Sequence, residues 1–322
     1  MDAQVRNLVK ATIPVLKEHG VALTSYFYQR MFRHNPELHQ IFNRSHSDTG
    51  KQAMALAGAV LAYAENIDDP SVLAPVITLI AHKHASLGIR AEHYPIVGKH
   101  LLASIKEVLG DAASDELINA WGIAYGVLAD VLIEAEGKLY AEAATRDGGW
   151  SGWRPFRITD KVAESEEITS FYLTPTDGGA LPAFRPGQYT TVRVFVPEWN
   201  VMQPRQYSLS DAPGSAAFRI SVKREPGSDG TPAGRVSNRL HDAYNKGDII
   251  DLAPPFGDFY LHEDRDTPVV LISGGVGITP MISMLKHLIA TAKNRPVQFI
   301  HTCRNADVLA FGARLHKAAA DN

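Results

Sequence analysis

Hydrophobic residues in the first half of the chain recur at helical spacing. One run, Val5, Leu8, Val9, Thr12 and Leu16, fits intervals of three and four residues. Three later runs fit the same intervals: Gln52, Leu56, Ala59 and Tyr63; Leu73, Ile77, Ile80, His84 and Leu87; and Trp121, Tyr125, Leu128 and Leu132. Because this spacing gathers apolar side chains on one helix face, it predicts an all-α first half.

The second half alternates apolar and polar residues at a period of two. The alternation covers residues 156–162, 168–173, 189–196 and 218–223, with Gly, Pro and Asp turns between them. Short strands at this spacing predict an antiparallel barrel or sandwich. From residue 267 the pattern becomes strand (268–272), glycine-rich turn (273–277), helix (279–292) and strand (296–301), which predicts one βαβ unit.

Composition divides the chain at the same place. Residues 1–150 hold 5 of the 19 prolines and 8 of the 13 histidines. Because proline is excluded from helix interiors, the proline-poor first half is again predicted to be helical. At roughly 150 residues per domain, a chain of 322 residues predicts two domains and a remainder. We expect the glycine-rich stretch 146–153 to be the linker.

Charge and cysteine content exclude several classes of protein. The net charge of −3 gives no basic surface for nucleic acid or for an anionic membrane. The single cysteine, Cys303, cannot form an internal disulfide or a cysteine-based metal site, and we expect it to be a small buried hydrophobe. We see no signal-peptide core and no run of the ~18 to 20 apolar residues that span a bilayer. We therefore expect a cytoplasmic protein that is not integral to a membrane.

His84 is the candidate ligand among the histidines of the first half. It lies four residues after Ile80 and three before Leu87, on the apolar face, whereas His82 is turned to the far side of the same helix. A lone histidine on such a face can be a core imidazole bonded to a carbonyl group. It can also be an axial haem ligand.

Other residues of the first half extend this pattern. Tyr28, Phe42, Gln52 and Leu56 precede His84, and in this order the sequence resembles the globin domain of the bacterial and fungal flavohaemoglobins. The resemblance implies that His84 is the proximal ligand of the iron of haem b. It also implies that Phe42 packs on the haem, that Leu56 lines the pocket, and that Tyr28 and Gln52 stand on the distal side.

Tyr94 and Glu136 match the same family. A carboxylate that accepts the second N–H of a metal-bound imidazole makes the ring more electron-rich. Such a ring favours ferric iron and suits oxygen chemistry better than oxygen storage. Glu134 is the competing carboxylate; it lies two residues earlier and should face elsewhere on the helix, so we prefer Glu136.

Three segments of the strand-rich region resemble the flavin domain of the ferredoxin-reductase family. They are Pro186-Gly-Gln-Tyr189, Arg205-Gln206-Tyr207-Ser208 and Gly234-Arg-Val-Ser237-Asn. The resemblance implies that Arg205 meets the FAD pyrophosphate, that Tyr207 packs on the flavin or its ribityl chain, and that Ser208 approaches the redox edge of the ring. Gly234 to Ser237 lead into a predicted helix over 236–244, whose free N–H groups would hold phosphate oxygens.

A glycine-rich turn follows the strand over 268–272. In Gly275-Val276-Gly277-Ile278-Thr279-Pro280 the glycines allow close approach to a pyrophosphate, Thr279 can cap the next helix, and Pro280 suits its first position. A tight turn without a ligand has the same composition, but after a flavin domain the segment resembles the NAD(P)-binding turn of the same family. No ribose-binding carboxylate is evident in 301–305, so NADH and NADPH both stay open.

The whole chain thus resembles a multidomain flavohaemoglobin. The implied domains are an all-α globin (1–145), a linker (146–153), an antiparallel β-barrel FAD domain (154–265) and a partial α/β NAD(P) domain (266–322). The resemblance implies nitric oxide dioxygenase activity, in which NAD(P)H reduces haem through FAD, and O2 and NO give nitrate. We expect a monomer whose partners are small molecules. The alternatives are an oxygen- or NO-binding or sensing globin and a flavin reductase with another acceptor.

The family's NAD domain carries a further strand with a Cys-Gly-Pro motif and an aromatic residue against the flavin, and neither follows His301 here. A two-stranded sheet is marginal without more strands or covering helices. From the sequence we therefore expect a poorly protected C-terminal segment, with an open edge at the strand 297–301, and impaired hydride transfer.

Overall fold

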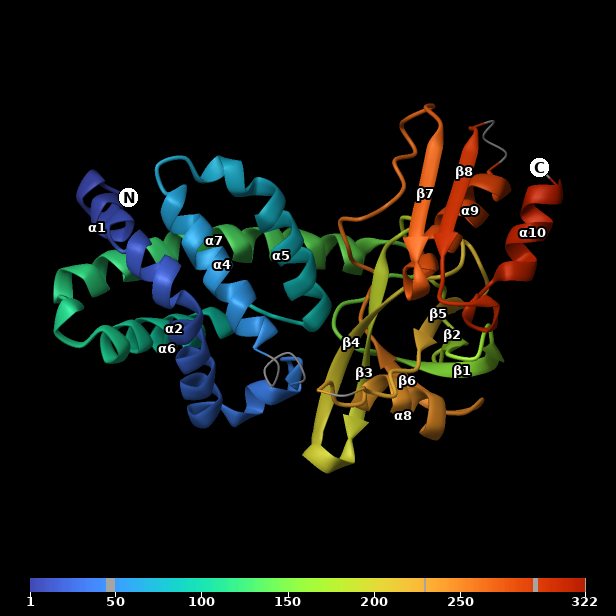
Figure 1. Cartoon of the computed structure of the whole chain (residues 1–322), viewed down its shortest axis with the longest axis horizontal. Helices are drawn as coiled ribbons and strands as arrows, with labels where there is room; N and C mark the ends of the chain where they lie inside the picture. Colours follow the sequence, from blue (N-terminus) through green and yellow to red (C-terminus); the bar gives the residue numbers. More distant parts are fainter. Residues whose placement is uncertain (45–49, 229, 292–294, 322) are drawn as a thin grey trace. The chain divides into compact units, whose positions relative to one another are not determined.

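The computed structural model describes residues 1–44, 50–228, 230–291 and 295–321. The chain folds into two compact units, Met1–Tyr140 and Ala141–Asn322, and each is considered by itself. Figure 1 follows the chain from the helices of the first unit (blue to green) to the strands and later helices of the second (green to red).

The first unit is helical, as the hydrophobic spacing predicts. Its α-helices are α1 (Ala3–Ala11), α2 (Ile13–His34), α4 (Lys51–Glu65), α5 (Ala74–Leu87), α6 (His93–Leu109) and α7 (Asp115–Thr145), with the short 3₁₀ helices η1 (Pro36–Gln40), η2 (Pro70–Leu73) and η3 (Gly110–Ala112) between them. The first hydrophobic run spans two helices rather than one. Thr12 ends α1, and Pro14 lies in the first turn of α2, where a missing backbone N–H costs nothing.

The largest core of the first unit joins five of its helices. Its buried members come from α1, α2, α4, α6 and α7 and include Val9, Phe27, Met31, Leu101 and Trp121. By length and composition, α7 is the one described helix that could cross a membrane. Trp121, Ala124 and Leu132 of α7 are buried inside this unit, whereas Ile123, Val127 and Val131 of the same helix are between 40% and 42% exposed.

The second unit begins with a six-stranded antiparallel sheet of order β4-β3-β6-β1-β2-β5. The strands are β1 (Arg154–Ala163), β2 (Ile168–Pro175), β3 (Tyr189–Val196), β4 (Val201–Ser208), β5 (Phe218–Lys223) and β6 (Ile249–Leu252). The six strands do not form the closed barrel that the sequence predicts. The edge strands of the sheet, β4 and β5, still approach each other through one antiparallel bridge between Leu209 and Ile220, so the sheet curls almost fully round.

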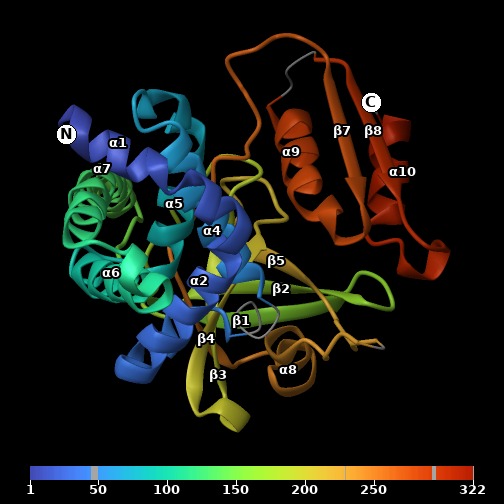
Figure 2. The same cartoon turned by 60° about the vertical axis from the view of Figure 1, so that its left-hand side comes forward.

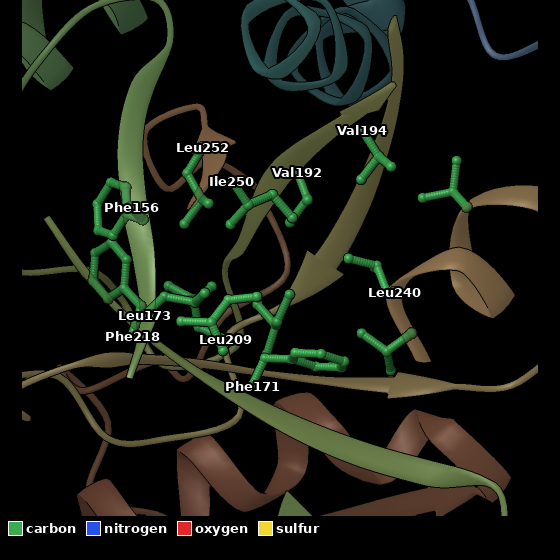
Figure 3. Packing of buried hydrophobic residues seen from close by; sticks show 14 of the residues in the cluster. Phe156, Phe171, Leu173, Val192, Val194, Leu209, Phe218, Leu240, Ile250 and Leu252 are labelled. Atoms are coloured by element: carbon green, nitrogen blue, oxygen red, sulfur yellow. The ribbon is translucent and has the colours of Figure 1, made fainter. Parts of the chain in front are cut away.

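The curled sheet encloses a hydrophobic core, which Figure 3 shows from close by. Side chains from neighbouring strands, among them Phe156, Phe171, Val192 and Ile250, point into this interior and are at most 3% exposed. Leu240 of helix α8 (Arg235–Ala243) belongs to the same cluster. The alternation of the sequence therefore marks the inward face of each strand.

The last part of the second unit is a short α/β arrangement, clearest in Figure 2. Strands β7 (Val269–Gly274) and β8 (Val297–Thr302) are parallel, and η5 (Gly275–Gly277) and α9 (Ile278–Ala290) connect them. The predicted helix end at residue 292 lies outside the described residues. After β8 come η6 (Ala306–Val308) and α10 (Gly312–Asp321), which the hydrophobic pattern did not predict.

The sheet of β7 and β8 has two strands among the described residues. Val270, Ile272 and Ile300 are between 40% and 62% exposed on it. Cys303, predicted to be buried, is exposed. It follows the end of β8, where the chain has left the covered part of the sheet.

Candidate functional site

The structure brings His84, Tyr94 and Glu136 together in the first unit. The Nδ1 atom of His84 lies 2.7 Å from Oε1 of Glu136, and the Tyr94 hydroxyl donates to the same oxygen at 2.5 Å. Glu136 is only 2% exposed, whereas the side chain of His84 is 32% exposed. Since a carboxylate only accepts hydrogen bonds, this contact assigns the proton to Nδ1 and leaves the lone pair on Nε2.

Glu134, the competing carboxylate, lies elsewhere on α7. Its Oε1 atom accepts from Lys138 at 2.6 Å, and both side chains are about 70% exposed. Two residues along a helix turn a side chain by roughly 200°. The structure therefore places Glu136, and not Glu134, beside His84.

A second layer of side chains holds Tyr94 in place. The Tyr125 hydroxyl donates to the Tyr94 carbonyl at 2.7 Å. Gly98 makes room for the Tyr125 ring, because a Cβ there would lie 2.6 Å from its Cε1 atom. Burial, and then the Glu136 carboxylate, raise the pKa of Tyr94 far above its ordinary value. The Tyr94 hydroxyl therefore keeps its proton and acts as a donor.

The other globin candidates lie on α2, after η1 and on α4. Tyr28 packs on Phe42, with ring centroids 6.1 Å apart, and both belong with Leu56 to the partly buried rim of the helical core. Burial raises the pKa of Tyr28, and a side-chain hydrogen bond with Gln52 works in the opposite direction. The structure thus pairs Tyr28 with Gln52, which are 24 positions apart in sequence.

The side chains of this candidate site fit a haem group. Among the described residues no hydrogen bond engages Nε2 of His84, and imidazole nitrogen is a common axial ligand of haem iron. The opposite ring nitrogen is held by a buried carboxylate, as in other carboxylate–histidine–metal arrangements. The aromatic and aliphatic side chains of Phe42 and Leu56 suit the face of a porphyrin.

The flavin candidates lie on two paired strands. Arg205-Gln206-Tyr207-Ser208 forms the last four residues of β4. Tyr189 of β3 pairs with Ser208, and Thr190 pairs with Tyr207. Sequence reasoning missed β4 because Pro204 interrupts its pattern; the N–H that proline lacks is tolerated at this edge of the sheet.

Arg205 fits an anionic group such as a pyrophosphate. Its Nη1 atom donates to the Pro204 carbonyl at 2.7 Å and lies 3.5 Å from the Gln203 amide oxygen. Burial lowers the pKa of the Arg205 guanidinium to about 10. Because burial disfavours the charged guanidinium, a phosphate bound beside it would offset this cost.

Helix α8 begins at the third flavin segment. Gly234 is its N-cap, and a Cβ there would lie 2.4 Å from Oγ of Ser237 and 2.9 Å from Cβ of Glu225. Only glycine therefore fits without a local shift. The start of α8 offers backbone N–H groups to phosphate oxygens. The predicted helix 236–244 is shifted by one residue from the observed one.

The nucleotide turn forms η5 and the start of α9. Gly275 has a φ of +51°, a value that favours glycine. The turn differs from expectation in two details. Thr279 does not cap α9 but donates from Oγ1 to the Val276 carbonyl at 3.0 Å, and Pro280 is the third rather than the first helical residue. Val276 and Ile278 lie within the same turn.

A cavity of about 460 Å³ in the second unit contains none of these candidates. Residues of 174–184 and 212–218 line it.

The sequence did not predict roles for four further residues, Tyr125, Asp211, Arg219 and Lys286. Arg219 occupies a polar position of the alternating strand 218–223, and only the structure shows that it is buried and therefore needs partners.

Two segments of the chain match known families. Residues 25–132 match the Globin family, and residues 267–316 match the Ferric reductase NAD binding domain family. A flavohemoprotein of Chromobacterium violaceum is 62% identical over 319 residues, which cover 99% of this chain and 79% of that protein.

Solved structures show the same kinship. A flavohemoglobin from Malassezia yamatoensis, with bound FAD and heme, superposes with a TM-score of 0.89 and 28% identity over 99% of this chain and 82% of that one. The flavohem-like FAD/NAD binding domain of nitric oxide dioxygenase from Vibrio cholerae has a TM-score of 0.50 and 41% identity, over 52% of this chain and 70% of that one. Because the similarity covers both units and most of each full-length relative, this chain belongs to the flavohemoprotein family.

Proposed function

We propose that this chain is an NAD(P)H-dependent nitric oxide dioxygenase, a cytoplasmic monomer that uses haem b, FAD and NAD(P)H. The observation that carries the proposal is the buried Glu136 carboxylate on Nδ1 of His84. When bound, the three cofactors together supply electron transfer from nicotinamide to iron and the conversion of O2 and NO to nitrate. The relatives from M. yamatoensis and V. cholerae support this choice of cofactors and activity.

On the proximal side, His84 would hold the iron through Nε2. Glu136 accepts the Nδ1 proton and fixes the orientation of the imidazole ring, and Tyr94 holds the carboxylate from its other side. The carboxylate makes the imidazole more electron-rich, which favours reaction with oxygen over simple storage. This electronic effect separates the proposed enzyme from an oxygen-binding or sensing globin.

On the distal side, Tyr28 would offer its hydroxyl proton as a hydrogen-bond donor within the pocket. Its raised pKa keeps the hydroxyl protonated, and Gln52 orients it. Phe42 and Leu56 would keep water from the porphyrin face. A protonated donor in a partly apolar pocket stabilises developing negative charge on oxygen.

In the second unit, Arg205, Gly234 and Ser237 would hold the FAD pyrophosphate. Tyr189, Gln206, Tyr207 and Ser208 would line the flavin and its chain. The Gly275–Gly277 turn and the start of α9, Ile278 to Pro280, would hold the nucleotide that donates the hydride.

The cofactor assignment is tested by two matched histidine variants. In protein loaded with haem and FAD, His84→Ala should lose the Soret band and keep the flavin absorbance. His82→Ala, two residues away on the same helix, should keep both. Loss of the Soret band in both variants, or in neither, would contradict the assignment of His84.

The activity is tested with the full chain under anaerobic conditions. NADH or NADPH is added, then O2 and NO, while haem reduction is followed optically and nitrate is measured. Haem reduction with nitrate formation supports the proposal. Flavin reduction without haem reduction would indicate a flavin reductase with another acceptor, and no reduction would indicate a binding globin.

A further inference from the structure

Asp211 connects the two cofactor-binding segments of the second unit. It lies three residues after Ser208, the last residue of the flavin strand β4. Its carboxylate contacts the Lys286 ammonium group, and its carbonyl accepts from Oγ of Ser283 at 2.7 Å. Ser283 is one helical turn after Thr279 of the nucleotide segment. A single residue thus contacts α9 through both its side chain and its backbone.

The carboxylate is buried and has a second cation beside it. The side chain of Asp211 is 11% exposed, and Oδ2 lies 3.8 Å from Nε of Arg219, whose side chain is 1% exposed. Oδ1 also accepts the backbone N–H of Ala212 at 2.8 Å. Because buried charges are costly unless they are paired, these partners fix the position of the carboxylate closely.

Arg219 is itself held between two aromatic rings. Its guanidinium carbon lies 5.8 Å from the centroid of Tyr172 and 5.1 Å from that of Phe311. It also donates to the carbonyl of Ser210. Phe311 has a φ of +62°, an uncommon conformation for a bulky side chain, and is 3% exposed. Such a conformation persists only where the surroundings enforce it.

The curled sheet and α9 approach each other closely at a second point of their junction. Gly187 precedes β3 with a φ of +108°, and a Cβ there would lie 2.5 Å from the Cε atom of Met284 and 2.7 Å from the Phe259 carbonyl oxygen. Met284, Ser283 and Lys286 are neighbours on α9. The curled sheet and α9 therefore meet at two separate points, one charged and one steric.

From these contacts we propose that Asp211, with Lys286, is a positioning residue that fixes the nucleotide turn relative to the flavin strand for hydride transfer. The inference rests on the proposed function, in which a hydride passes from the nicotinamide to the flavin and leaves oxidised nucleotide and reduced flavin. Neither side chain needs to touch the reacting atoms. Their pairing sets the distance and angle between two sites that bind separately.

The first test measures the relative position of the two parts and does not depend on enzyme activity. Cys303 is exposed and is the chain's single cysteine, and Lys246 is exposed on the sheet side of the junction. Spin labels on Cys303 and on Lys246→Cys, in the FAD-loaded full chain, report the distribution of distances between the two parts. We expect Asp211→Asn and Lys286→Met to broaden this distribution. Lys106→Met, which removes an exposed lysine–carboxylate pair in the first unit, should leave it unchanged.

The second test measures the chemistry that depends on that position. At saturating NADH, the rate constant for flavin reduction should fall on the order of 10- to 100-fold in both variants, as displacements of about 1 Å cost in other enzymes. The KM for NADH and the Kd for FAD should stay within about twofold, since neither binding segment is altered. Lys286→Met keeps the test decisive if Asp211→Asn fails to fold because the buried Arg219 has lost its counter-charge.

The outcomes separate this inference from the proposed function. An unchanged distance distribution in Lys286→Met overturns the inference, as does a loss of FAD binding equal to the loss of rate. If the unmodified chain reduces its flavin with neither NADH nor NADPH, the proposed reductase step fails. The distance distribution then decides alone whether Asp211 and Lys286 fix the junction.

Discussion

Replacing Glu136 by glutamine tests the electronic role of the proximal carboxylate. The substitution keeps the shape of the side chain and one oxygen acceptor for His84 but removes the negative charge. In the structure this oxygen lies 2.7 Å from Nδ1 of His84 and 2.5 Å from the Tyr94 hydroxyl, in a site where Glu136 is 2% exposed. Little solvent is present there to screen the charge.

The expected effect follows from hydrogen-bond strengths. A bond to a charged acceptor contributes about 1.5 to 3 kcal/mol, against about 0.5 to 1.5 kcal/mol for a neutral one, so the substitution loses about 1 to 1.5 kcal/mol. A tenfold change in equilibrium, about 1.4 kcal/mol, corresponds to about 59 mV for one electron. If the whole difference acts on ferric iron, the midpoint potential of the haem rises by about 40 to 60 mV.

Spectroelectrochemical titration of the haem-loaded chain measures this shift. Glu134→Gln is the matched control, because Glu134 is exposed on the same helix and pairs with Lys138. Its potential should equal that of the unmodified chain. A potential in Glu136→Gln that is unchanged or lower would refute the reasoning, and an equal shift in both variants would assign the effect to the helix as a whole.

Three further predictions concern stability. Gly98→Ala should destabilise the first unit by about 1 to 3 kcal/mol, because its Cβ would lie 2.6 Å from the Tyr125 ring; thermal unfolding measures this. Gly122→Ala, whose nearest contact would be an ordinary 3.6 Å, should instead be neutral or stabilising by up to about 1 kcal/mol, and a cost equal to that of Gly98→Ala would contradict the steric explanation. The hydrogen bond from Arg154 lowers the pKa of Asp177 to about 2. The stabilisation that this pair gives the folded protein is therefore fully present above the unfolded pKa of ~3.9 and is lost as the pH falls toward 2. The decline of the melting temperature over that interval should therefore be shallower in Asp177→Asn, and an identical decline would show that this pair does not matter.

Much of the architecture follows from the sequence, because hydrophobic periodicity is local information. The spacing around His84 predicts a helix with that histidine on its apolar side, and the alternation over 189–196 coincides with β3. The pattern fails where a local rule is broken for a tertiary reason. Pro204 concealed β4, and exposed Cys303 contradicted the usual preference of a free thiol for the interior.

The candidate site residues also divide into those that the sequence indicates and those that only the tertiary structure brings together. Order and residue type alone make His84, Tyr28 and Arg205 candidates, since each belongs to a segment that resembles its family. Only the tertiary structure decides between Glu134 and Glu136, because the choice depends on which side of α7 faces His84, 52 residues before Glu136 in the chain. It alone joins Asp211 to Lys286, which are 75 positions apart. Pairing between distant charges depends on packing, and a sequence read residue by residue carries no record of it.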